Sequence, residues 1–170
     1  MRSARLFLLV LVAAAALAVA AGAAAMRPGP VEDGTLSVRD GRAVLQLRLT
    51  GGVIGRFARG KLTVTEPAVG ASTIVVRGAR RTRYVNARTT VYQGANIRYR
   101  LSSNRRFTVR IDATKINLSA VGLGDGWLDG RGNMERGIYF DGSYSLNGEA
   151  YRSLPDEREP IELAAVPTDE

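Results

Sequence analysis

The chain contains no cysteine and no histidine, and these two absences exclude much familiar chemistry. Without cysteine there is no disulfide and no site for a bacterial lipoprotein anchor, so packing alone must stabilise the folded part. Without histidine, Ser-His-Asp and Cys-His nucleophile systems, Cys/His zinc sites and imidazole pH switches are also excluded. We therefore predict no cofactor and no metal site, and we expect a protein that is not an enzyme.

A sustained helical period of apolar residues is also missing after residue 33. Glycine is abundant, at 19 residues, and β-branched residues recur between turn signals. Strands with turn signals at roughly 8- to 12-residue spacing are typical of all-β domains. The sequence predicts an all-β domain over residues 34–154, built as an antiparallel sandwich or barrel-like fold. A β-solenoid is the alternative, although no repeat of fixed length supports it.

Two hairpins are predicted within this domain. Asp40-Gly41 is a type I′ turn signal between the alternating segments 36–39 and 42–49. The second predicted hairpin joins residues 97–101 to residues 107–111 through a polar loop. In both hairpins, period-2 alternation places the apolar side chains on one buried face.

Residues 1–25 have the layout of a secretory signal peptide: two arginines, a dense apolar core and an alanine-rich stretch with small residues at alternating positions. An uncleaved membrane anchor is the competing interpretation, because 21 uncharged residues run from 6 to 26. Residues 26–33 are interpreted as a linker, and the acidic, proline-containing residues 155–170 as a flexible tail. Either N-terminal interpretation predicts a domain that is secreted or held at the outer face of the cytoplasmic membrane.

Four short segments carry a resemblance to a known group of proteins: residues 34–38 (GTLSV), 52–57 (GVIGRF), 118–122 (LSAVG) and 144–148 (YSLNG). In these segments the chain resembles an uncharacterised family of predicted exported, β-rich actinobacterial proteins. The resemblance implies export and a bacterial origin, and it implies no activity.

Charge is distributed unevenly along the chain. Residues 34–110 contain 16 basic residues against two acidic ones, whereas residues 111–170 contain 5 basic and 12 acidic residues. In the second predicted hairpin the arginines alternate with apolar residues, so Arg98, Arg100, Arg106 and Arg110 are expected on one outer face, with Arg98 opposite Arg110. Like charges facing each other across strands repel, and a bound anion would relieve that repulsion.

These four arginines are our candidate anion-binding residues. The function predicted from them is a non-catalytic, exported domain of the cell envelope that binds an anionic polymer or a membrane surface. Nucleic acid is a weaker candidate, because the domain is exported and shows no interleaved aromatic platform. A protein that self-associates through sheet edges is a second expectation, and the oligomeric state is left open.

The acidic residues give less specific signals. Asp125 and Asp129, in a glycine-rich segment, provide oxygens of the kind that calcium prefers, but their spacing matches neither an EF-hand loop nor a calcium β-roll. A carboxylate-dependent hydrolase is a third alternative for function. Its candidate acids lie in or beside predicted turns, and nothing in the sequence singles out two of them: Asp112, Asp125, Asp129, Glu135 and Asp141.

Overall fold

The computed structural model describes residues 33–131 and 141–164, and within these ranges the chain is all-β and antiparallel, as predicted. The strands are β1 (Gly34–Thr65), β2 (Thr73–Asn86), β3 (Thr89–Gly130), β4 (Ser143–Leu146), β5 (Arg152–Ser153) and β6 (Glu159–Leu163). They form one sheet in the order β2-β3-β1-β4-β5, and β6 pairs with β3. In this part of the chain no helix long and apolar enough to cross a membrane is found.

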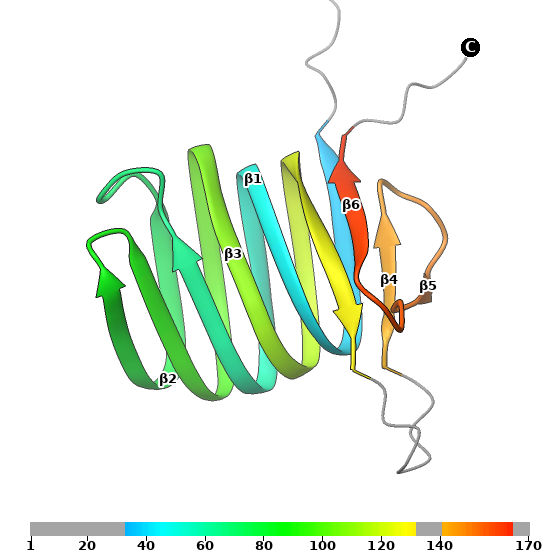
Figure 1. Ribbon diagram of the computed structural model, residues 1–170, viewed down its shortest axis with the longest axis horizontal. Helices are drawn as coiled ribbons and strands as arrows, with labels where there is room; N and C mark the ends of the chain where they lie inside the picture. The colour runs from blue at the N-terminus through cyan, green and yellow to red at the C-terminus, as the bar shows by residue number, and fades with distance from the viewer. Residues whose placement is uncertain (1–32, 132–140, 165–170) are drawn as a thin grey trace, which may run out of the picture. The chain divides into compact units, whose positions relative to one another are not determined.

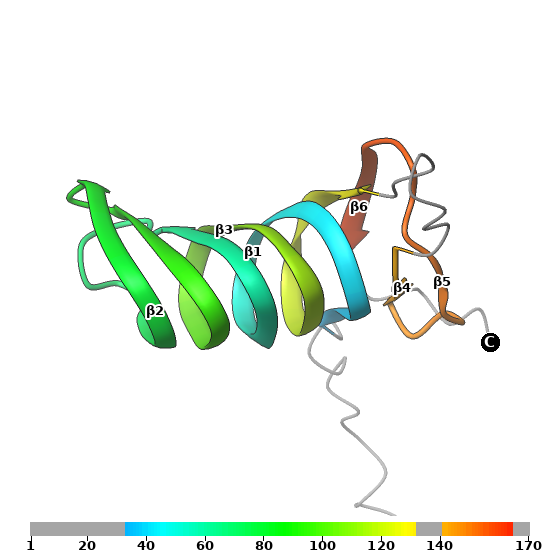
Figure 2. The ribbon, with the colours of Figure 1, turned by 90° about the horizontal axis from the view of Figure 1, so that it is seen from below.

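The two long strands β1 and β3 form a ribbon that winds into a coil (Figures 1 and 2). Most β1 residues in the middle of the ribbon pair with β3 at both of their edges. Leu47, for example, pairs with Val109 on one edge and with Gly126 on the other, 17 residues further along β3. One turn of the coil therefore takes 17 residues of β3 at this point.

The pairing divides the coil into two sides. The first side consists of residues 34–38, 51–57, 73–77, 97–103 and 117–122 together with β4. The second side consists of residues 43–49, 59–65, 79–86, 89–95, 107–113 and 124–130 together with β6. Alternate residues on both sides point inward and form a single apolar core.

The bends between the two sides explain why the first predicted hairpin is wrong. Asp40, Asn96 and Lys115 have φ values of 49°, 54° and 53°, and each lies at or beside a shift in strand register. A residue with positive φ at such a bulge redirects a strand without reversing it. The Asp40-Gly41 signal therefore marks a positive φ correctly, but β1 continues through it, and Val38 pairs with Leu118 instead of Ala43.

The second predicted hairpin is also absent, because residues 102–106 remain inside β3. Leu101 pairs with Val53 on the first side, whereas Phe107 pairs with Leu49 on the second side. The alternation that the hairpin rested on is nevertheless correct. The apolar residues at 97, 99, 101, 107, 109 and 111 are all buried.

The C-terminal residues differ from the predicted flexible tail at 155–170. Residues 159–163 form β6, which pairs with residues 124–128 of β3 and buries Ile161 and Leu163. The hydroxyl of Tyr144 donates a hydrogen bond to Glu159 Oε1 at 3.0 Å, which ties β6 to β4. The folded domain therefore extends past residue 154. The predicted segment 1–25, most of the linker 26–33 and residues 165–170 lie outside the described residues.

One buried hydroxyl in the core is energetically unfavourable. Tyr99 is 4% exposed, and among the described residues its hydroxyl has no hydrogen-bond partner. A buried polar group without a partner costs about 1–3 kcal/mol. Burial also raises the pKa of Tyr99, because the ionised form would lose its hydration.

Tyr99→Phe is therefore expected to raise the free energy of unfolding by about 1 kcal/mol. It should also weaken the alkaline loss of stability. An unfolded tyrosine ionises near pH 10 while folded Tyr99 stays protonated, so stability present below about pH 10 declines as the pH rises further. The pKa of Tyr144 is also raised, to about 12, by burial and by Glu159. The variant should therefore keep part of the loss of stability at alkaline pH.

Urea denaturation at neutral and at alkaline pH measures both effects. Tyr84→Phe is the matched control, because Tyr84 is 78% exposed and its replacement should leave stability unchanged. A Tyr99→Phe variant less stable than the native chain would show that the hydroxyl is satisfied in solution.

Candidate anion-binding face

The four candidate arginines do not form one group. Arg98 and Arg100 lie on the first side of the coil, whereas Arg106 and Arg110 lie on the second side, because β3 crosses between the sides near residue 104. Arg98 therefore does not face Arg110, whose partners in the sheet are Gln46 and Thr63.

The two arginines on the second side have partners supplied by the C-terminal third of the chain. Arg106 Nη1 lies 3.6 Å from Asp125 Oδ2, and Asp125 also binds Arg48 at 2.8 Å. The guanidinium of Arg110 lies 5.3 Å from the ring centre of Trp127, and the guanidinium of Arg158 lies 4.1 Å from the same ring centre. Asp125 therefore neutralises part of the positive charge on this side, whereas Trp127 stabilises two guanidinium groups by cation–π contact.

Arg98 has different neighbours, which the sequence did not indicate. It pairs with Arg56 of β1 on one edge and with Arg77 of β2 on the other. Side chains directly opposite in neighbouring strands have Cβ atoms about 4.5–5.5 Å apart. The fold therefore aligns three guanidinium groups in one row across three strands, which we call the arginine row (Arg56, Arg77 and Arg98).

No salt bridge within the described ranges involves a member of the arginine row. Arg100 lies two residues from Arg98 on the same outer face and likewise has none. Opposed like charges on a sheet are destabilising, by a few tenths of a kcal/mol to about 1 kcal/mol for each pair. The arginine row is thus a cluster of positive charge that no salt bridge of the described residues neutralises.

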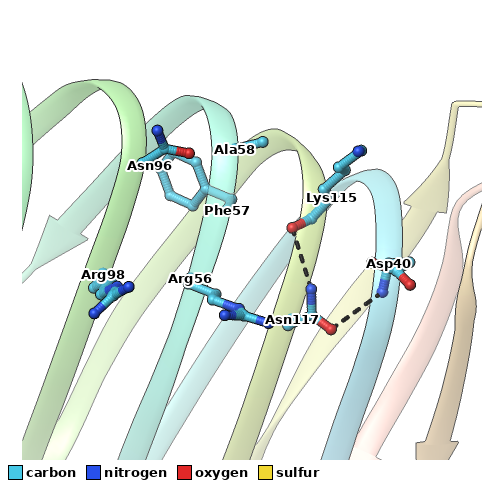
Figure 3. A pocket seen from close by; sticks show the side chains of 8 residues that line it. All are labelled: Asp40, Arg56, Phe57, Ala58, Asn96, Arg98, Lys115 and Asn117. Atoms are coloured by element: carbon cyan, nitrogen blue, oxygen red, sulfur yellow. Dashed lines mark hydrogen bonds between the residues drawn. The ribbon is translucent and has the colours of Figure 1, made fainter.

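A pocket of about 250 Å³ opens at one end of the row (Figure 3). Arg56 and Arg98 line it from the strands, and Lys115 and Asn96 line it from the bends. Three cations therefore surround a small space, and Asp40 is the one acidic residue among the described residues that line it.

Asn117 ties two of the bends at this pocket together. Its Nδ2 donates to the carbonyl of Lys115 at 3.4 Å, and its Oδ1 accepts from the amide of Asp40 at 3.5 Å. Lys115 keeps a positive φ, which costs a non-glycine residue about 1–2 kcal/mol. Lys115, together with Arg56 and Arg98, makes the pocket a candidate oxyanion site.

Protein-family models, curated proteins and solved structures offer no match to this chain. The function has to be inferred from the chemistry of the face itself.

A second, wider groove continues from the pocket along the same side. Arg39, Ile54 and Tyr151 contribute to its lining, with the guanidinium of Arg39 stacked 3.9 Å from the centre of the Tyr151 ring. Arg56 and Arg98 line both the pocket and the groove. The two depressions therefore form one continuous basic surface.

Among the described residues, the carboxylates considered for calcium or hydrolysis lie elsewhere. Asp125 pairs with Arg48 and Arg106, and Asp112 lies 3.8 Å from Arg131. Across residues 33–131 and 141–164, no group of three or more acidic residues that would hold a metal ion is found.

The outer edge of β2 bears on the expectation of self-association. Among the described strands β2 pairs with β3 alone, so its other edge has no partner in this part of the chain. This strand carries Arg77, Arg80, Arg81 and Arg83. Charged residues on an edge strand oppose pairing with a like-charged strand. A direct β2-to-β2 contact between two copies is therefore unfavourable.

Proposed function

We propose that this chain is an exported, non-catalytic protein of the cell envelope that binds anionic groups through the first side of its coil. We further propose that the two sides face each other across the single apolar core as in a sandwich. The observation that carries the function is the arginine row, together with Arg100, without a salt bridge in the described ranges.

The chemistry of the row suits repeated oxyanions such as phosphate or carboxylate groups. Guanidinium groups bind such anions through charge-assisted, often bidentate hydrogen bonds. Three neighbouring strands present them at the sheet spacing of about 4.8 Å, so several negative groups of one polymer can be bound at once. Export is supported by the signal-like residues 1–25, and the lack of histidine and cysteine supports a binding role.

The test measures binding of the full chain, in a neutral detergent, to soluble inorganic polyphosphate. Arg56→Ala combined with Arg98→Ala is expected to weaken binding about tenfold, since a hydrogen bond to a charged group contributes about 1.5–3 kcal/mol before solvent screening. Binding should also weaken steeply as salt is added.

The matched control is Arg48→Ala combined with Arg106→Ala. It removes the same charge from the second side, where both arginines already pair with Asp125, and should have a much smaller effect. Equal losses in the two variants would indicate a response to net charge alone, and salt-independent binding would contradict the proposal.

A further inference from the structure

The first side of the coil carries exposed apolar side chains among its arginines. Ile54, Val75 and Val121 are 52%, 44% and 45% exposed, and all three point outward from this side. Arg100 lies directly between two of them, because it pairs with Val75 on one edge and with Ile54 on the other. Aliphatic and guanidinium groups therefore alternate across the strands.

Acidic groups are absent from this surface. Within residues 34–38, 51–57, 73–77, 97–103 and 117–122 there is no aspartate or glutamate. The same segments contain all three members of the arginine row and Arg100. The first side is thus basic and partly aliphatic at once.

Outside residues 79–86, where Tyr84 and Val85 are exposed, the second side has neither property. Its outward residues include Asp112, Asp125 and Asp129, and two of these take part in salt bridges. None of the exposed large apolar residues of the described ranges lies in residues 43–49, 59–65, 107–113 or 124–130. The first side therefore presents cations and aliphatic groups without acidic residues, whereas the second side pairs part of its positive charge with carboxylates.

We propose that the first side docks on the surface of an anionic lipid bilayer. A soluble polymer would need only the arginines, whereas a bilayer offers phosphate groups directly above an apolar layer. Arginines at this surface bind lipid phosphates, and Ile54, Val75 and Val121 reach the headgroup boundary between them. This inference rests on the proposed anion-binding function and names its partner.

Site-specific labelling of the full chain tests which side meets the bilayer. The chain has no native cysteine, so Ser119→Cys on the first side and Thr63→Cys on the second each provide one labelling site. Both positions are half-buried and point outward in the middle of their side. A fluorophore at position 119 should be quenched by brominated lipids in vesicles of phosphatidylcholine with phosphatidylglycerol, and much less in phosphatidylcholine alone.

A second measurement separates the aliphatic residues from the arginines. Val75→Ser combined with Val121→Ser should weaken binding to the anionic vesicles about tenfold, because these side chains would no longer be buried against the apolar layer. It should leave polyphosphate binding unchanged, since neither residue lines the pocket or the groove. Val69→Ser combined with Val85→Ser is the matched control, since both residues are exposed outside the first side.

The outcomes distinguish this inference from the proposed function. If polyphosphate still binds but the serine variant binds vesicles as the native chain does, the membrane inference is overturned and anion binding stands. Equal quenching at positions 119 and 63 also overturns it, because contact would then come from elsewhere in the chain. If neither polyphosphate nor anionic vesicles respond to the arginine row, both proposals fail.

Discussion

Replacing Gly122 with alanine is expected to cost about 3–5 kcal/mol of stability, the largest effect of a single substitution that we predict. Gly122 is buried, has a φ of +148° and pairs with Gly51 where the ribbon turns from the first side to the second. A Cβ atom at this position would overlap the carbonyl oxygen of Thr50 and crowd the Cα of Gly51. Both are backbone atoms, so the clash is relieved only by moving the paired strand.

Gly70→Ala is the control that separates strain from overlap. Gly70 also has a positive φ, of +70°, but a Cβ there would meet nothing within 4 Å. Its cost should stay near 1 kcal/mol, the usual penalty for an alanine in a left-handed conformation. Chemical denaturation of both variants provides the comparison. Similar losses at the two positions would mean that backbone strain, and not the close approach of the strands, governs Gly122.

Replacing Ile161 and Leu163 with alanine together is expected to cost about 4 kcal/mol, since each buried aliphatic truncation costs at least about 2 kcal/mol. Both side chains belong to the core cluster and are 5% and 1% exposed. Both side chains therefore contribute to core packing where β6 pairs with β3.

Glu162→Ala is the matched control, because this residue lies between the two and its side chain is exposed. Its effect should be below about 0.5 kcal/mol. The thermal midpoint and the urea midpoint of the three proteins decide the question. If the double variant is as stable as the control, residues 159–163 contribute no packing, and a flexible tail would be the correct description after all.

The two incorrect hairpin predictions show that local sequence signals do not determine strand pairing. Asp40 has the positive φ that its turn signal indicates, yet β1 continues because its partners are distant: Val38 pairs with Leu118, 80 residues away in the chain. A turn signal reports the conformation of two residues, whereas the choice between a reversal and a bend depends on which strands are available to pair. That choice is a property of the whole coil.

β6 is a strand that formed where the composition predicted none. Residues 155–170 are acidic and rich in proline, which is the composition of an unstructured segment. Five of these residues nevertheless pair with β3, because an open sheet edge and an uncovered core are available next to them. Amino-acid composition alone does not predict that such an edge and core are available.

The sequence predicted two arginines of the candidate site but not their neighbours. Alternation correctly placed Arg98 and Arg100 outward, opposite buried neighbours. The other members of the arginine row could not be found, since Arg56 and Arg77 join Arg98 only through the register of β1 and β2 with β3. No spacing within any one segment encodes that register.

By itself the sequence determined the all-β class, the inward and outward alternation and the excess of positive charge, because these depend on residue type and on a period of two. Only the tertiary structure decided which arginines become neighbours and which are neutralised. The physical reason is that Arg56, Arg77 and Arg98 lie at least 21 residues apart in the chain and meet only through the pairing of β1 and β2 with β3. On the second side, the same winding brings Asp125 to Arg48 and Arg106.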